Sequence, residues 1–168
     1  MGMVASAHLA YGYDLGFGED FKAAERGEYG EPKLPWLPVD EDGDSVYSDF
    51  GGEVEKRLLA SVGFTEEWMQ DESDEERKGR WARHREAEKR IGVELDSSGH
   101  HDNPGWVLIA KDSDRNVEWS EAMTVDLDEL TNRPGYEGWD TKLADALAAL
   151  GITPTQDGPK WLVYPSYG

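Results

Sequence analysis

The sequence predicts a single α+β domain over residues 1–168: an antiparallel sheet of four to five strands, with about three helices mostly on one face. Three observations lead to this prediction. Residues 105–111 carry an apolar, β-branched and aromatic run between Asn-Pro and Asp-Ser-Asp. Such a run is typical of a strand buried on both faces at the centre of a sheet. Other segments alternate polar and apolar residues, and three segments repeat apolar residues with a helical period.

The composition predicts a folded chain that lacks cysteine chemistry. Hydrophobic residues make up 38% and charged residues 32% of the sequence, and the apolar residues cluster in periodic segments. Because there is no Cys, disulfides, thiolate metal sites and thiol nucleophiles are excluded. We find no secretory pattern and no apolar span approaching about 20 residues. We therefore expect a soluble intracellular protein without a membrane partner.

The formal net charge of −19 restricts the class of partner. Phosphates would be repelled, so we do not expect direct binding to nucleic acid. Two interpretations stay open: the charge only keeps the chain soluble, or it presents a negative surface to a basic partner.

The first predicted strand covers residues 6–15, which alternate apolar and polar positions. One face collects its larger apolar side chains, from Leu9 to Leu15. His8 lies on the opposite, polar phase. Neither His8 nor His84 has an evident orienting partner in the sequence.

Residues 19–52 form a proline-rich, acidic segment that we expect to be loosely structured and extended across the domain. Trp36 would dock it on the core. Its acidic patch is the candidate partner-binding site, comprising Asp40, Glu41, Asp42, Asp44 and Asp49. The patch does not fit an EF-hand, because Ser45 stands at loop position 6 and Gly51 at position 12.

Two helices are predicted over residues 53–62 and 74–91, with a short turn at 65–70 between them. The first ends at Gly63, which can adopt the left-handed cap. The second begins with a capping box formed by Ser73 and Glu76.

The second helix is the most polarised segment of the chain. Seven of the 17 basic residues lie in residues 77–91, behind an acidic first turn that suits the helix dipole. We expect several of its arginines to pair with acids of the same chain; the candidates are Arg77, Arg80, Arg83, Arg85 and Arg90. The alternative is an unpartnered basic stripe, which would make nucleic acid a candidate ligand.

The remaining elements complete the sheet and its helix layer. Residues 92–98 are predicted to form a hairpin with the central strand, and residues 117–126 a further strand with a possible bulge at Glu121. One helical turn could follow it. The clearest helix covers residues 138–150, and a last strand covers residues 160–165.

The strongest enzymatic candidate is His100-His101-Asp102. With a carboxylate such as Asp14, the two imidazoles could hold a divalent metal. Adjacent side chains of an extended segment point to opposite sides, however, so both would serve one ion only if the loop bends. No serine lies in a nucleophile elbow. We expect no cofactor.

Four segments resemble a family of small acidic proteins from the phages of actinobacteria. They are Tyr-Gly-Tyr-Asp-Leu at 11–15, Arg-Ile-Gly-Val-Glu at 90–94, Leu-Gly-Ile-Thr-Pro-Thr at 150–155, and the terminal residues 159–168. The proline-rich segment does not belong to the pattern. This resemblance implies expression in the cytoplasm of a bacterial host and an accessory role in infection, and it supplies no catalytic residues.

The leading functional hypothesis is a non-enzymatic protein that engages a host or phage protein through its negative surface, as a DNA-charge mimic or an inhibitor. The alternative is a small metal-dependent hydrolase or nuclease using His100, His101 and a carboxylate.

Overall fold

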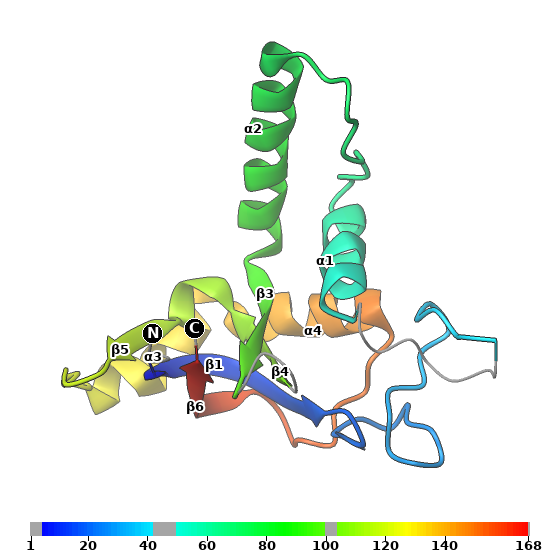
Figure 1. Ribbon diagram of the computed structural model, residues 1–168. Coiled ribbons are helices and arrows are strands. Elements are labelled where there is room, and N and C mark those ends of the chain that lie inside the picture. Colours follow the sequence, from blue (N-terminus) through cyan, green and yellow to red (C-terminus); the bar gives the residue numbers. More distant parts are fainter. Residues whose placement is uncertain (1–4, 42–49, 100–103, 168) are drawn as a thin grey trace.

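The computed structural model describes residues 5–41, 50–99 and 104–167. Its sheet is organised around β1 (Ala5–Phe17), the longest strand. Along one edge β1 pairs antiparallel with β4 (Gly105–Ala110) and β5 (Arg115–Glu118). Along the other edge it pairs with β6 (Lys160–Tyr167) and β2 (Asp20–Phe21). In Figure 1 β1, β4 and β6 lie below α1 and α2.

The sixth strand, β3 (Val93–Ser98), closes the sheet into a half-barrel. It pairs antiparallel with β4, so the predicted hairpin is confirmed, and β4 lies between β1 and β3 as predicted. Past the end of β3, Gly99 bridges to Ser166 of β6, and its N–H donates to the carbonyl of Pro165 at 2.8 Å. The six-stranded sheet therefore curls back on itself.

The helices mostly cover one face of this sheet, as predicted. The larger core cluster joins Leu15 and Leu108 of the sheet to α1 (Phe50–Ser61) and α4 (Trp139–Leu150). α3 (Leu127–Glu137) precedes α4, and its Arg133 lies over the ring of Trp139 in the first turn of α4. Trp161 of β6 donates to the carbonyl of Leu130 in α3. The two-residue alternation of β1 explains this layer, because its apolar phase faces the helices.

The opposite face carries a small second cluster of Ala10, Val107, Ile109 and Tyr164. Near it β1 and β4 approach so closely that a Cβ at Gly12 would lie 2.0 Å from the carbonyl oxygen of Leu108. Only glycine fits this position.

α2 (Asp74–Ile91) stands apart from both layers. In Figure 1 it projects from the sheet with α1 beside it, and the chain between them rises to the far end of α2, where α2 begins. The predicted capping box of Ser73 and Glu76 is present, and Gly92 ends the helix in the left-handed conformation at φ 61°. We call α1, residues 62–73 and α2 together the hairpin.

The structure corrects one part of the sequence analysis. The strand predicted over residues 117–126 ends at Glu118, because Ser120 adopts φ +70° and Glu121 turns back to bond Glu118 through backbone and side chain. The single helical turn expected next is the full helix α3, capped by the Asp126 carboxylate. The described chain thus contains six strands and four α-helices.

Candidate functional site

The most distinctive surface is residues 64–73, which we call the acidic loop. It connects α1 to α2 and has no regular secondary structure. Trp68 and Met69 are 58% and 65% exposed in it, although both are large apolar side chains. Exposed carboxylates flank them, at Glu67 and Asp71. Aromatic and methionine side chains of this kind are enriched at the centres of protein interfaces.

A buried ion pair anchors the loop to α2. The Arg80 guanidinium donates from Nε to both carboxylate oxygens of Glu72, at 2.9 and 3.1 Å. The side chains are only 9% and 10% exposed, so the pair is shielded from solvent and from salt. The guanidinium also lies over the Trp68 ring, 4.6 Å from its centroid. Trp68 is therefore held on one side while more than half of its surface faces solvent.

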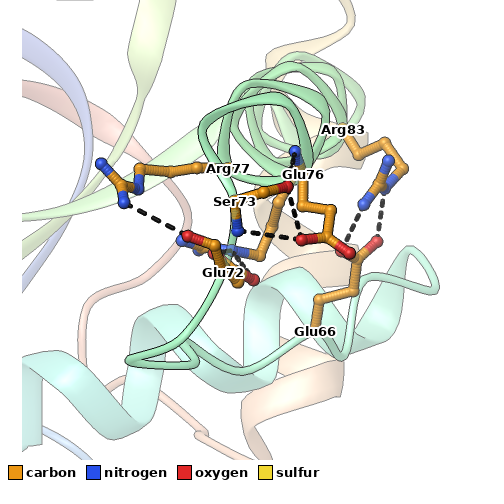
Figure 2. Close-up of polar contacts among 7 residues, drawn as sticks. Glu66, Glu72, Ser73, Glu76, Arg77 and Arg83 are labelled. Atoms are coloured by element: carbon orange, nitrogen blue, oxygen red, sulfur yellow. Dashed lines mark hydrogen bonds and ion pairs between the residues drawn. The ribbon is translucent and has the colours of Figure 1, made fainter.

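Three further contacts hold the loop, and Figure 2 shows them together with Glu72. Arg83 pairs with Glu66 through two hydrogen bonds, with Nη2 donating to Oε2 at 2.7 Å. Arg77 donates to the backbone carbonyl of Glu72 at 3.4 Å. Ser73 N–H and Oγ donate to Glu76, and Glu76 N–H donates back to Ser73 Oγ.

These contacts change the acidity of two loop-anchoring carboxyls. The hydrogen bond from Arg83 holds the pKa of Glu66 below its ordinary value. The Ser73 hydroxyl and backbone N–H lower the pKa of Glu76 in the same way. Both residues are charged at neutral pH, so the loop keeps its negative character and its anchors at once.

The arginine prediction is confirmed for three of its five residues. Arg77 pairs with Asp74 at 3.4 Å, Arg80 with Glu72, and Arg83 with Glu66. In the described part of the chain, no acidic partner lies within ion-pair distance of Arg85 or Arg90. Arg77, Arg80 and Arg83 therefore anchor the loop, whereas Lys78, Arg85, Lys89 and Arg90 are exposed and have no acidic partner among the described residues.

Of the acidic patch predicted in the sequence, the structure describes only Asp40 and Glu41. Asp40 and Glu41 are exposed, at the end of the segment that follows Leu37. Asp42, Asp44 and Asp49 lie outside the described residues. So do the three residues of the proposed metal site, His100, His101 and Asp102. Both site predictions stay predictions.

A second polar cluster lies on the sheet face away from the helices. His8 Nδ1 lies 2.9 Å from an Asp114 carboxylate oxygen, and the His8 ring stacks on Tyr164 with centroids 5.1 Å apart. The Tyr164 hydroxyl donates to Asp96 at 2.6 Å. Burial, with this hydrogen bond to the carboxylate, raises the pKa of Tyr164 far above its ordinary range. A histidine held by a carboxylate can act as a general base.

The contacts of this cluster, however, fasten four segments to each other. His8 comes from β1, Asp96 from β3, Tyr164 from β6, and Asp114 from the turn before β5. They join the two ends of the half-barrel where β3 meets β6. Among the described residues, no group of three or more His, Asp or Glu side chains has a geometry that could hold a metal ion.

Sequence analysis missed both clusters. It treated residues 65–70 as a turn, and it found no partner for His8. The partner of His8 stands 106 positions away, so only the strand pairing could bring it near. The capping box and the arginine-rich helix were the available signals for the hairpin, but exposure of Trp68 left no mark in the sequence.

Comparisons of the chain with protein-family models, curated proteins and solved structures gave no match. The resemblance to a phage protein family therefore stays a prediction. No helix in the described ranges is both long and apolar enough to cross a membrane.

Proposed function

We propose that this chain is a non-enzymatic binding protein that engages a basic partner protein through its acidic surface, with the acidic loop at the centre of the contact. The observation that carries the proposal is the exposure of Trp68 and Met69 beside the exposed carboxylates of Glu67 and Asp71, in a loop anchored by a buried ion pair. An anchored loop loses little conformational entropy on binding, which favours affinity.

The charge of the chain supports a basic partner. At −19 it attracts cationic surfaces over long range and speeds their encounter. The exposed apolar side chains then supply the short-range contact that charge alone lacks. A DNA-binding protein presents a cationic surface of the kind that this chain would engage. The chain would then act as a mimic of DNA charge. In the setting implied by the phage resemblance, the partner is a host or phage protein in the bacterial cytoplasm.

A pull-down with three matched variants tests the proposal. Trp68→Ala with Asp71→Asn removes the centre of the acidic loop. The second variant neutralises Asp40, Glu41, Asp42 and Asp44, the patch predicted from the sequence. The third, Asp145→Asn at an exposed position of α4, is the control. We expect wild type and control to retain a partner that is released by salt, and the loop variant to lose it.

The result of the pull-down shows whether the acidic loop or the segment at 40–44 makes the contact. Loss of the partner only in the second variant would move the contact to the acidic segment at 40–44. Equal retention by all three variants would contradict binding through either surface.

The metal-dependent hydrolase or nuclease stays an alternative hypothesis that rests on His100, His101 and a carboxylate. It predicts stoichiometric divalent metal in the purified protein. The metal should be lost when both histidines are replaced by alanine. Metal analysis of the two proteins tests it directly.

A further inference from the structure

A cavity of about 510 Å³ lies under the acidic loop, between the loop and the two helices of the hairpin. α1 contributes Leu59 and Ala60 to its walls, and the loop contributes Phe64 and Trp68. This volume lies in the range of protein sites that enclose small ligands or single side chains.

The chemistry of the cavity differs between its walls and its rim. Leu59 and Phe64 are buried and apolar. Three lining residues carry exposed carboxylates, Glu55, Glu66 and Glu67, of which Glu66 is already paired with Arg83. Arg80 also lines the cavity, but Glu72 neutralises its charge. An apolar wall below an acidic rim matches a side chain that has a long hydrocarbon stem and a cationic head.

A cation of the chain already lies at this rim. Lys56 Nζ is 3.7 Å from a carboxylate oxygen of Glu67, and both side chains are well exposed to solvent. An exposed pair at this distance contributes little and exchanges readily with solvent. Lys56 can therefore swing away and leave its position to a cation of higher affinity.

We propose that this cavity receives one lysine or arginine side chain of the basic partner. The inference rests on the proposed function and names the contact made at that site. The stem lies against Leu59 and Phe64, and the head group meets the rim carboxylates beside the indole of Trp68.

A peptide series tests the occupant. The probe is a short basic peptide whose central residue is lysine, arginine, norleucine or glutamate, with all flanking residues constant. Norleucine keeps the stem and removes the charge. We expect the lysine and arginine peptides to bind wild type about tenfold more tightly than the norleucine peptide, as measured by titration calorimetry. The glutamate peptide should bind most weakly.

Two variants locate the contact. Ala60→Trp fills the cavity from an exposed helical position, and it should remove the preference for lysine over norleucine. The same change at Ala148, exposed on α4, is its control and should leave the preference intact. Lys56→Gln vacates the rim and should tighten lysine-peptide binding about twofold or more. Amide shifts of Ala60 and Phe64 on addition of peptide to wild type report the same contact without substitution.

The outcomes separate the two proposals. Basic peptides that bind in a salt-dependent way, with equal affinity for lysine and norleucine and no shift at Ala60 or Phe64, would overturn the cavity inference and leave the proposed function standing. Preference for the glutamate peptide would mean that the cavity takes anions, which also overturns the inference. Failure of every basic peptide and every basic protein to bind would contradict both.

Discussion

α2 and α4 are both well-formed helices, yet different forces hold them. α4 buries an apolar stripe against the sheet, formed by Trp139, Leu143, Ala146, Leu147 and Leu150. α2 is longer, but its buried residues are only Arg80 and Ala87. It is held by a capping box, by the Arg80–Glu72 pair and by exposed ion pairs. α4 is therefore stabilised mainly by hydrophobic burial, and α2 mainly by charge, with Ala87 adding a small apolar contact to Leu59 and Phe64.

This difference has a consequence for dynamics. Burial of apolar surface is insensitive to salt at moderate concentrations, whereas exposed ion pairs are screened by it. Regions with few buried apolar contacts open locally at lower free energy than the core. We therefore expect α2 and the acidic loop, which carries the proposed contact, to open at a lower free energy than the sheet.

The largest effect is expected for a truncation in the body. Leu143→Ala removes a fully buried side chain of α4 and leaves a cavity in the main core. We expect the free energy of unfolding to fall by about 2–5 kcal/mol, as measured by chemical denaturation. Asp145→Ala, exposed on the same helix, is the control and should change it by less than about 0.5 kcal/mol. A Leu143 variant as stable as this control would contradict core burial as the force that holds α4.

A smaller and local effect is expected in the hairpin. Glu72→Gln leaves the buried Arg80 guanidinium without its counter-ion. We expect the local opening free energy of α2 to fall by about 1–3 kcal/mol, because the desolvated cation keeps its cost and loses its partner. Hydrogen exchange of α2 amides measures this. If α4 amides lost protection to the same extent, the hairpin would not be a separate unit.

The next smaller effect is expected at the N-cap of α2. Ser73→Ala removes the hydroxyl that bonds Glu76 at the start of α2. We expect a loss of about 1 kcal/mol, seen as faster exchange in the first turn of α2. Glu76→Ala should cost a similar amount, and the double variant should cost less than the two single losses together, because the two residues act as one cap. Strict additivity would show that they act independently.

The pH response should be the smallest, with opposite signs in the two regions. The pKa of Glu76 is lowered in the folded chain by its bonds to Ser73. Its contribution is present above the ordinary value of 4.5 and is lost as the pH falls through the lower folded pKa. Burial raises the pKa of Glu94 on β3, so its contribution is present below 4.5 and lost as the pH rises through the raised value.

Acidification from neutral pH should therefore loosen the first turn of α2 while it relieves the strain at Glu94. Amide exchange followed between about pH 6 and pH 3 would show the two trends. A first turn that gains protection on acidification would contradict the sign derived for Glu76.

The comparison also explains how far the sequence could predict the molecule. Local patterns carried the α+β class, the central strand at 105–110, the β3–β4 hairpin and the capped helices α2 and α4, because each depends on neighbouring residues. The end of β5 was mispredicted because the positive φ of Ser120 is not encoded by a glycine. The apolar residues beyond it, such as Val125, continue the alternation but are exposed.

The candidate site could not be predicted in this way, because it depends on how the loop folds against α2. The side chains that anchor the acidic loop are charged, and nothing in their spacing distinguishes Glu72, which is buried, from Asp71, which is exposed. Glu72 is shielded from solvent because the loop folds against α2, and this places the Glu72 carboxylate against Arg80. Nothing in the sequence distinguishes Trp68, which is exposed, from the tryptophans that pack in the core.

Native-state hydrogen exchange at two salt concentrations tests the central claim most directly. Exchange would be measured for α2 and α4 amides at about 0.1 M and about 1 M salt, where the Debye length falls from about 10 Å to about 3 Å. We predict that α2 opens at a lower free energy than α4, and that only α2 loses protection at high salt. Equal opening free energies for the two helices, unchanged by salt, would contradict the division into a charge-held α2 and an apolar body.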